Sequence, residues 1–148
     1  MADNIIQFSE GFHKLINKFV DKEMVPRILD SGELLYRIEI HVIVAIAENP
    51  GINLTGLSEV LGVTKGAISQ KVKILEKKGY VKRYKNLDNN KKLLFELTEK
   101  GNKVFLGHIE FHKQFNDRIL KEVGKIEDSD LEKIIKMFKV IENHLETL

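Results

Sequence analysis

The stretch VTKGAISQKVKILEKKGYVKRYKN, residues 63–86, combines an apolar stripe with short polar side chains and many lysines. Ile68, Val72 and Leu75 recur at helical spacing, so they share one face of a predicted helix and pack inward. The helix is expected to run from Lys65 to about Lys78, with Thr64 as its cap and Gly79 closing it. What the opposite face carries then decides what this helix is for.

That outer face holds short hydrogen-bonding residues near the helix start and lysines beside them, which suits a helix inserted into the major groove of DNA. Ser69 and Gln70 are expected to address base edges, and Gly66 to let the backbone approach closely. The lysines would mainly meet phosphates; they are Lys65, Lys71 and Lys73.

Thr64 has a possible second role at the start of this helix. The positive N-terminal end of a helix, with its unpaired N–H groups, suits a phosphate. Simple capping is the alternative reading, and the two roles are compatible. Thr64 is therefore included among the expected DNA contacts.

Charge is distributed unevenly along the chain, although the formal net charge is only +2. Ten Lys and Arg residues lie between Thr64 and Lys92, against two acidic residues. Such a run can be merely a solvated face, but next to a groove-reading helix it favours a polyanion partner. Arg83, Lys91 and Lys92 extend the expected DNA-binding surface beyond the helix.

Three further helices are predicted before this stretch. Helical spacing in the first 26 residues predicts one that stops near Pro26 or shortly after it. A second is expected from about Tyr36 to Glu48, with Ile40, Ile43, Val44 and Ala47 as its buried stripe. Thr55 is expected to cap a short third helix whose inward residues are Leu57, Val60 and Leu61, and Gly62 permits the tight turn that follows.

After Gly79 the pattern changes to that of a hairpin. Two strands, 80–84 and 93–97, flank a polar and basic loop, where Lys91 and Lys92 would reach into or along the minor groove as a wing, unless the loop is only a solvated turn. Thr98 then opens a long helix that ends at Gly124. The spacing Ser129-x-x-Glu132 predicts the capped start of a last helix.

The predicted fold is mainly α. Residues 36–97 form a winged helix-turn-helix, and the long terminal helices, within 1–35 and 98–148, carry more apolar surface than that unit can cover. We expect them to pack against a second copy as a dimerisation region. An intramolecular helical bundle is the alternative.

Composition excludes several other classes of protein. The chain has 148 residues, 43% of them hydrophobic, with no membrane span and no cysteine for disulfides or thiolate chemistry. The first residues carry Asp3 and Glu10 where a secretory signal would be basic and apolar, so a cytoplasmic protein is expected. No nucleophile, base pair or glycine-rich phosphate loop indicates an enzyme, and in His108-Ile-Glu-Phe-His112 the glutamate is one position late for a zinc-protease helix.

Residues 36–101 resemble the winged helix-turn-helix of MarR-family transcriptional regulators, through LSEVLGVTKGAISQKVKILEKKGYVKR (57–83) and LFELTEKG (94–101). The resemblance implies a homodimer that binds a pseudopalindromic operator, commonly as a repressor, and releases it on a signal. The family's wing usually carries Asp-x-Arg where this chain has Asn89-Asn90-Lys91, and a lysine lacks the rigid fork of arginine.

The histidines also resemble those of the zinc-responsive MarR subgroup, in which metal strengthens DNA binding. That resemblance implies a zinc site at Glu23, His41, His108 and His112, and three imidazoles with one carboxylate suit tetrahedral zinc. The subgroup's second site needs a cysteine that this chain lacks.

The effector is left open by the sequence. The fatty-acid-regulating MarR subgroup has similar histidines and the same Glu-x-His beginning, here Glu39-Ile40-His41, so an acyl or other small organic ligand is the alternative to zinc. A winged helix used only for protein contacts is a further alternative, against which the basic segment argues.

Overall fold

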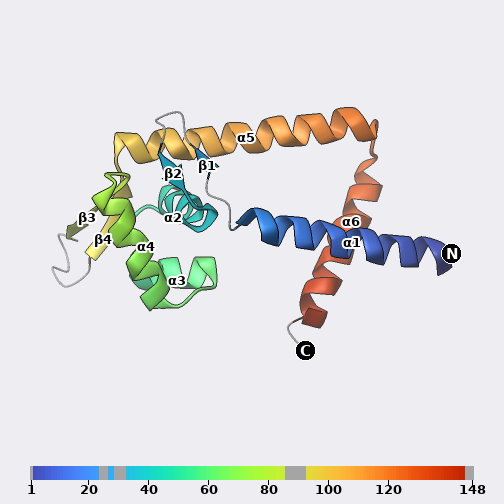
Figure 1. Cartoon of the computed structure of the whole chain (residues 1–148), viewed down its shortest axis with the longest axis horizontal. Coiled ribbons are helices and arrows are strands. Elements are labelled where there is room, and N and C mark those ends of the chain that lie inside the picture. Colours follow the sequence, from blue (N-terminus) through green and yellow to red (C-terminus); the bar gives the residue numbers. More distant parts are fainter. Residues whose placement is uncertain (1, 24–26, 29–32, 86–92, 146–148) are drawn as a thin grey trace. The chain divides into compact units, whose positions relative to one another are not determined.

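The structure, a computed structural model, describes residues 2–23, 27–28, 33–85 and 93–145, with the backbone alone for residues 2, 22, 23, 27 and 28. The chain divides into two compact units, Met1–His108 and Ile109–Leu148. Helix α5 (Glu99–Val123) begins in the first unit and ends in the second. Figure 1 labels all helices and strands.

The first unit begins with helix α1 (Ala2–Glu23). Two short antiparallel strands follow, β1 (Arg27–Ile28) and β2 (Leu34–Leu35). The sequence analysis did not predict these strands, because a two-residue pairing leaves no readable alternation of apolar and polar residues. The predicted helix end near Pro26 lies outside the described residues.

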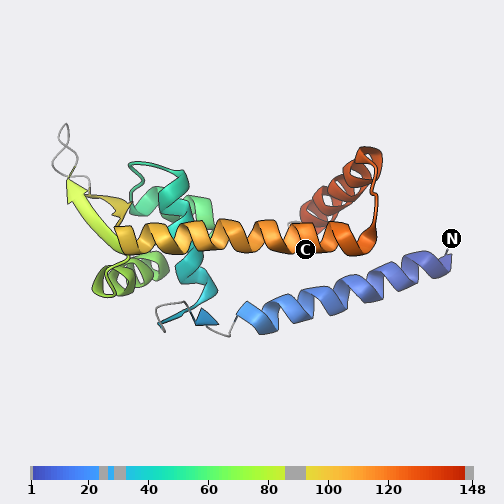
Figure 2. The same cartoon turned by 90° about the horizontal axis from the view of Figure 1, so that it is seen from above.

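Three helices pack against one another in the centre of this unit: α2 (Arg37–Glu48), α3 (Leu54–Leu61) and α4 (Lys65–Lys77). Figure 1 shows them gathered next to the hairpin of β3 (Val81–Lys85) and β4 (Leu93–Leu97). The hairpin is antiparallel, with Val81 opposite Leu97 and Lys85 opposite Leu93. Figure 2 shows it projecting away from the three helices, as the wing of a winged helix does.

The core of the unit is formed by buried apolar side chains of α2, α3, α4 and the hairpin. Tyr80, just before β3, is the largest fully buried one, and Phe95 of β4 is also buried. The others are Leu35, Ile40, Val42, Ile43, Ala45, Ile46, Ile52, Leu57, Ile68, Val72, Leu75 and Val81.

Two of the predicted apolar faces need correction. In α2 the structure buries Ile40 and Ile43 as predicted, but Val44 and Ala47 are only half-buried, while Val42, Ala45 and Ile46 are buried. The helix is enclosed on more than one side, so a single stripe underestimates its buried face. In α3 Val60 was wrongly placed inward, since its side chain is 55% exposed.

The predicted cap of α3 was also wrong. Asn53, not Thr55, precedes the helix, and its side-chain oxygen accepts a hydrogen bond from the backbone N–H of Gly56 at 2.9 Å. Asn53 also pairs with Leu94 of β4 in an isolated β-bridge, and the N–H of Phe95 donates to the carbonyl of Ile52 at 3.0 Å. The start of α3 is therefore fixed by the wing, which sequence spacing alone does not reveal.

The second unit holds the later part of α5 and helix α6 (Asp128–Leu145), separated by a turn in which Gly124 has φ +81°. Ser129 does not cap α6 as predicted, because the helix already begins at Asp128 and the N–H of Asp130 donates to the carbonyl of Glu127. None of the described residues of α6 is buried. Among the described helices, none is long and apolar enough to cross a membrane.

Candidate nucleic-acid interface

Helix α4 has the two faces that its sequence predicts. Ile68, Val72 and Leu75 are at most 1% exposed and anchor the helix in the core. The residues predicted to face a partner lie on the other side, where Ser69 is half-buried and the rest are exposed: Lys65, Gly66, Gln70 and Lys73. A rigidly anchored helix thus presents a polar, basic face.

The turn before α4 is held by local hydrogen bonds. Gly62 adopts φ +63°, a left-handed conformation that glycine enters without steric cost. The hydroxyl of Ser58 donates to the carbonyl of Val63 at 2.6 Å, and the N–H of Val63 donates back to the carbonyl of Ser58 at 3.2 Å. These bonds fix the angle at which α4 leaves α3.

Thr64 caps α4 as predicted. Its hydroxyl oxygen accepts a hydrogen bond from the N–H of Ala67 at 3.3 Å, and its backbone is extended. The side chain is exposed, so the first turn of α4 faces solvent. The capping role is therefore observed, and the phosphate-binding role of Thr64 stays a prediction.

Gly66 lies in the first turn of α4, where no internal packing requires a glycine. A Cβ atom added there would have no other atom within 4 Å apart from its own helix and neighbours. Glycine destabilises a helix relative to alanine by up to about 1 kcal/mol in the interior. Packing among the described residues therefore does not explain this glycine, and a close approach of its backbone to a partner stays a prediction.

Lys71 differs from the other lysines of the outer face. It is half-buried, and its ammonium group lies 5.8 Å from the ring centroid of Tyr36, just before α2. A cation over an aromatic ring is held in place by the ring's quadrupole. Lys71 therefore lies on the flank of α4 that faces the start of α2.

Two basic residues of β3 are held in ion pairs on the surface. The guanidinium group of Arg83 donates through two nitrogens to both carboxylate oxygens of Glu76, at the end of α4. This carboxylate raises the pKa of Arg83 above its ordinary value. Lys82 pairs with Glu96 across the hairpin at 3.0 Å, so part of the basic segment is already neutralised within the protein.

The partners of Arg83, Lys82 and Lys71 were not predicted from the sequence. Glu76 was visible as one of two acidic residues in a basic run, but Gly79 separates it from Arg83, and the reversal of the chain at that glycine brings the two together. Tyr36 gave no such signal. The predicted wing residues Lys91 and Lys92 lie outside the described residues.

Two of the four predicted metal ligands lie close together. The rings of His41 on α2 and His108 on α5 have centroids 6.1 Å apart in an edge-to-face arrangement. The Nε atom of Arg37 donates to Nε2 of His41 at 3.4 Å. His112 is exposed, one turn further along α5, and the side chain of Glu23 lies outside the described residues.

Within the described ranges, no group of three or more His, Cys, Asp or Glu side chains is arranged to hold a metal ion. Two imidazoles are fewer donors than a tetrahedral zinc site needs from a protein. The structure thus brings together two of the four predicted ligands, His41 and His108. A zinc site that also includes Glu23 and His112 stays a prediction.

Comparison with known proteins agrees with this geometry. The family model described as a winged helix DNA-binding domain matches residues 38–116, which span α2 to the middle of α5. The chain belongs to this family of winged helix DNA-binding domains, and its fold is that of MarR-type transcriptional regulators. This is a class of regulators and not of enzymes.

Individual relatives are similar over most of the chain. The "uncharacterized HTH-type transcriptional regulator YhjH" of Bacillus subtilis (strain 168) is 27% identical over 129 residues, which is 86% of this chain and 74% of that protein. The fold is similar to Streptococcus pneumoniae FabT in complex with DNA, with a TM-score of 0.78 and 23% identity, over 97% of this chain and 98% of that one. It is also similar to the zinc-responsive MarR family member ZitR of Lactococcus lactis, with a TM-score of 0.72 and 19% identity, over 95% and 99% of the two chains.

Proposed function

We propose that the chain acts as a cytoplasmic homodimer that binds a pseudopalindromic operator and represses transcription. The observation that carries this proposal is helix α4, whose apolar side is locked in the core while its polar, basic side is exposed. Each α4 would enter the major groove of one half-site, and the two half-sites would be centred about one helical turn apart.

In this proposal the outer residues of α4 divide into two groups. Ser69 and Gln70 read base edges, and a glutamine fits the paired donor and acceptor of adenine. Thr64 at the helix N-terminus and the lysines beside it bind phosphates. Residues of the wing would add further contacts to the DNA backbone. The proposed phosphate-binding residues are Thr64, Lys65, Lys71, Lys73, Arg83, Lys91 and Lys92.

The homodimer is supported by the exposed apolar side chains of the long helices. Phe8 and Phe19 of α1, Phe111 and Phe115 of α5, and Phe138 of α6 are all more than 40% exposed. Apolar faces of this extent on a monomer mark an interaction surface. A second copy covering them would form the dimerisation region proposed for residues 1–35 and 98–148, with 36–97 as the DNA-binding domain.

Zinc is the effector that a specific observation favours. His41 and His108 bring imidazoles from α2 and α5 together, and their ring nitrogens are good zinc ligands. If Nε2 of His41 were the ligating atom, it would exchange the hydrogen bond from Arg37 for the metal. Glu23 and His112 would complete the ligand set. Bound zinc would supply a fixed link between α2 and α5.

The decisive experiment is fluorescence anisotropy of the purified protein with labelled DNA from upstream of its own gene, first in a strong chelator and then in low micromolar zinc. Affinity that rises with zinc, and no longer does so in His108→Ala, would support the operator function and the metal together. Tight binding that ignores zinc would keep the repressor and indicate an acyl or other organic ligand. Binding that is absent, or independent of salt, would contradict the proposed DNA function.

Variants of α4 test the division of labour. Gln70→Ala should weaken binding to the operator more than binding to unrelated DNA, because the base contact is lost. Lys73→Ala should weaken both and reduce the slope of log affinity against log salt by about 2, which is about 1 for each protomer of the dimer. An unchanged slope would remove Lys73 from the phosphate-binding surface. Lys103→Ala, an exposed lysine of α5, is the matched control.

A further inference from the structure

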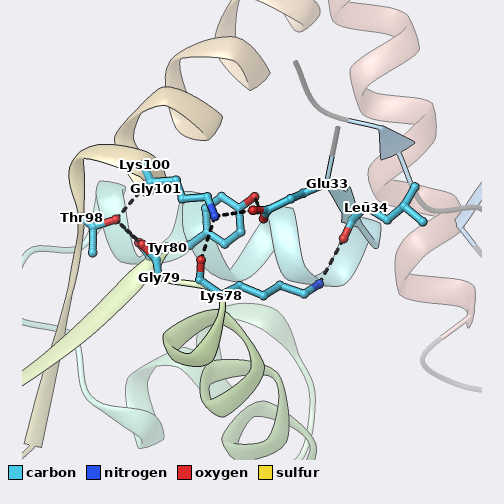
Figure 3. A network of polar contacts seen from close by, with 8 residues as sticks. All are labelled: Glu33, Leu34, Lys78, Gly79, Tyr80, Thr98, Lys100 and Gly101. Carbon is cyan, nitrogen blue, oxygen red and sulfur yellow. Dashed lines mark hydrogen bonds and ion pairs between the residues drawn. The ribbon is translucent and has the colours of Figure 1, made fainter. Parts of the chain in front are cut away.

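A cluster of charged and polar side chains joins the end of α4 to the start of α5 and to the segment before α2. Figure 3 shows most of this group, here called the junction cluster: Glu33, Glu39, Lys78, Tyr80 and Lys100. Its members come from three stretches of the chain that are far apart in sequence, 33–39, 78–80 and the start of α5. None of them belongs to the outer face of α4, so DNA contact does not explain them.

Glu33 connects two of these segments. One carboxylate oxygen accepts a hydrogen bond from the ammonium of Lys100 at 2.6 Å. The other accepts a hydrogen bond from the hydroxyl of Tyr80, whose side chain is buried. Both bonds lower the pKa of the Glu33 carboxyl, with that from Lys100 contributing most. The Lys100 ammonium also lies 4.3 Å from the ring centroid of Tyr80.

Lys100 links Glu33 to the C-terminal end of α4. Besides Glu33, its ammonium donates to the backbone carbonyl of Lys78 at 2.9 Å, immediately after the last residue of the helix. Carbonyls at a helix C-terminus lack partners within the helix and carry partial negative charge, so a cation there stabilises the helix end. Glu33 holds the cation that caps α4.

Lys78, at the end of α4, contacts the segment before α2 and the first turn of α2. Its ammonium donates to the carbonyl of Leu34 at 3.1 Å and pairs at 3.4 Å with Glu39, which is only 1% exposed. The second oxygen of Glu39 accepts from the N–H of Tyr36 at 2.8 Å. Lys78 is therefore bound within the protein and does not extend the basic surface of α4.

The backbone at this junction leaves little freedom for rearrangement. A Cβ atom on Gly101 would lie 2.2 Å from the carbonyl oxygen of Tyr80, closer than packed atoms approach. The hydroxyl of Thr98 donates to the carbonyl of Gly79 at 2.7 Å and accepts from the N–H of Gly101 at 3.1 Å. The first turn of α5 is thus in direct backbone contact with the chain leaving α4.

We propose that Glu33 is a positioning residue for DNA binding. Most of the outward-facing residues lie in the first half of α4, whose other side is anchored in the core. Lys78 and Lys100 add a second point of attachment at its C-terminal end. Glu33 orients Lys100, and without this carboxylate the cap on α4 loses its fixed geometry. A recognition surface must be held within a fraction of an ångström to be effective, so affinity for DNA should depend on Glu33 although it lies outside the DNA-contacting face.

Stability should respond much less than affinity. The side chains of Lys100 and Glu33 are 39% and 40% exposed, and ion pairs at such exposure contribute little to folding. A loss of DNA affinity in a variant with a nearly unchanged melting temperature would therefore report on position and not on unfolding.

The test is a double-mutant cycle with Glu33→Ala, Lys100→Ala and the double variant. The probe is a duplex selected from a random pool by the wild-type protein, in the presence and absence of zinc. Each single variant should bind about fivefold or more weakly, and the double variant no more weakly than Lys100→Ala, because Glu33 acts through Lys100. The exchanged pair Glu33→Lys with Lys100→Glu should not recover the affinity, because a carboxylate at position 100 cannot donate to the carbonyl of Lys78. Glu99→Gln, which removes an exposed ion pair one residue away, is the control.

Additive losses, or wild-type affinity in both single variants, would overturn the proposal. Because this inference rests on the DNA-binding role proposed for α4, amide hydrogen exchange without DNA provides an independent reading. Glu33→Ala should speed exchange at the N–H groups of Lys78, Gly79 and Tyr80, all of which donate to carbonyls of α4. Unchanged exchange rates at these three N–H groups would show that Glu33 does not hold the end of α4. This result does not depend on whether α4 binds an operator.

Discussion

At the scale of single residues, the chain separates side chains that build the fold from those that it leaves for a partner. Gln70 and Lys73 are exposed on a helix whose other side is fully buried. Lys78, a few residues later, is held by Leu34 and Glu39. Charge alone does not distinguish such lysines, but their contacts do.

Gly66 gives a prediction at this scale. Gly66→Ala should stabilise the protein by up to about 1 kcal/mol, since a Cβ there meets no neighbour and alanine favours the helix. If the backbone approaches DNA at this point, the same variant should bind more weakly. Thermal unfolding and anisotropy measure the two effects. Gly107→Ala, at another helical glycine with open surroundings, should stabilise without weakening binding, and equal binding in both variants would contradict the close approach.

Glu33 and Lys100 give a prediction about pH. The pKa of Glu33 is lowered from 4.5, so its stabilising contribution is present above that value and is lost as pH falls through the lowered pKa. The pKa of Lys100 is raised from 10.5, so its contribution is present below that value and is lost as pH rises through the raised pKa. The melting temperature of the wild type should exceed that of Glu33→Gln by a small amount, because the pair is exposed. This small difference should be largest at neutral pH and shrink toward acidic and alkaline pH. A constant difference across the range would be inconsistent with an ion pair.

At the scale of elements, sequence periodicity predicts helices well where one side is buried and caps are local. The inward face of α4, its Thr64 cap and the glycine after it all follow from spacings of a few residues. The start of α3 does not follow from local spacing, because the backbone at Asn53 pairs with Leu94 of β4, which is distant in sequence. The contact of Glu33 with Lys100 spans 67 positions, so neither residue carries a local signal of its partner.

The corrected cap of α3 can be tested directly. Asn53→Ala should destabilise the protein by about 1 kcal/mol, because the N–H of Gly56 loses its acceptor. Thr55→Ala, at the position that spacing alone suggested, should have a much smaller effect. Chemical denaturation of the two variants measures the difference. A larger loss from Thr55→Ala would restore the original assignment of the cap.

At the scale of the whole molecule, the two compact units differ in how they bury apolar residues. The first unit encloses a core around Tyr80, whereas α6 in the second has no buried residue within its described length. The amphipathic pattern of the long helices was readable from the sequence, and the second copy of the chain that it led us to expect on them stays a prediction.

The proposed dimer can be tested through α6. Phe138→Glu places a charge in the middle of an apolar face and should shift the protein from dimer to monomer in sedimentation velocity. Operator affinity should fall with it, since two linked α4 helices bind far more tightly than one. Lys136→Glu, a charge change at an exposed position of the same helix, should remain dimeric. A monomeric wild type would refute the assembly.

The ion pairs on and near β3 have a consequence for the kinetics of encounter. Glu76, Glu96 and Glu39 offset Arg83, Lys82 and Lys78, so in the described part of the basic segment the positive potential is concentrated on α4 and at Lys85. A localised potential orients a protein as it diffuses toward a polyanion. We therefore expect the regulator to approach the double helix with α4 leading, so that most collisions begin in a productive orientation before any base is read.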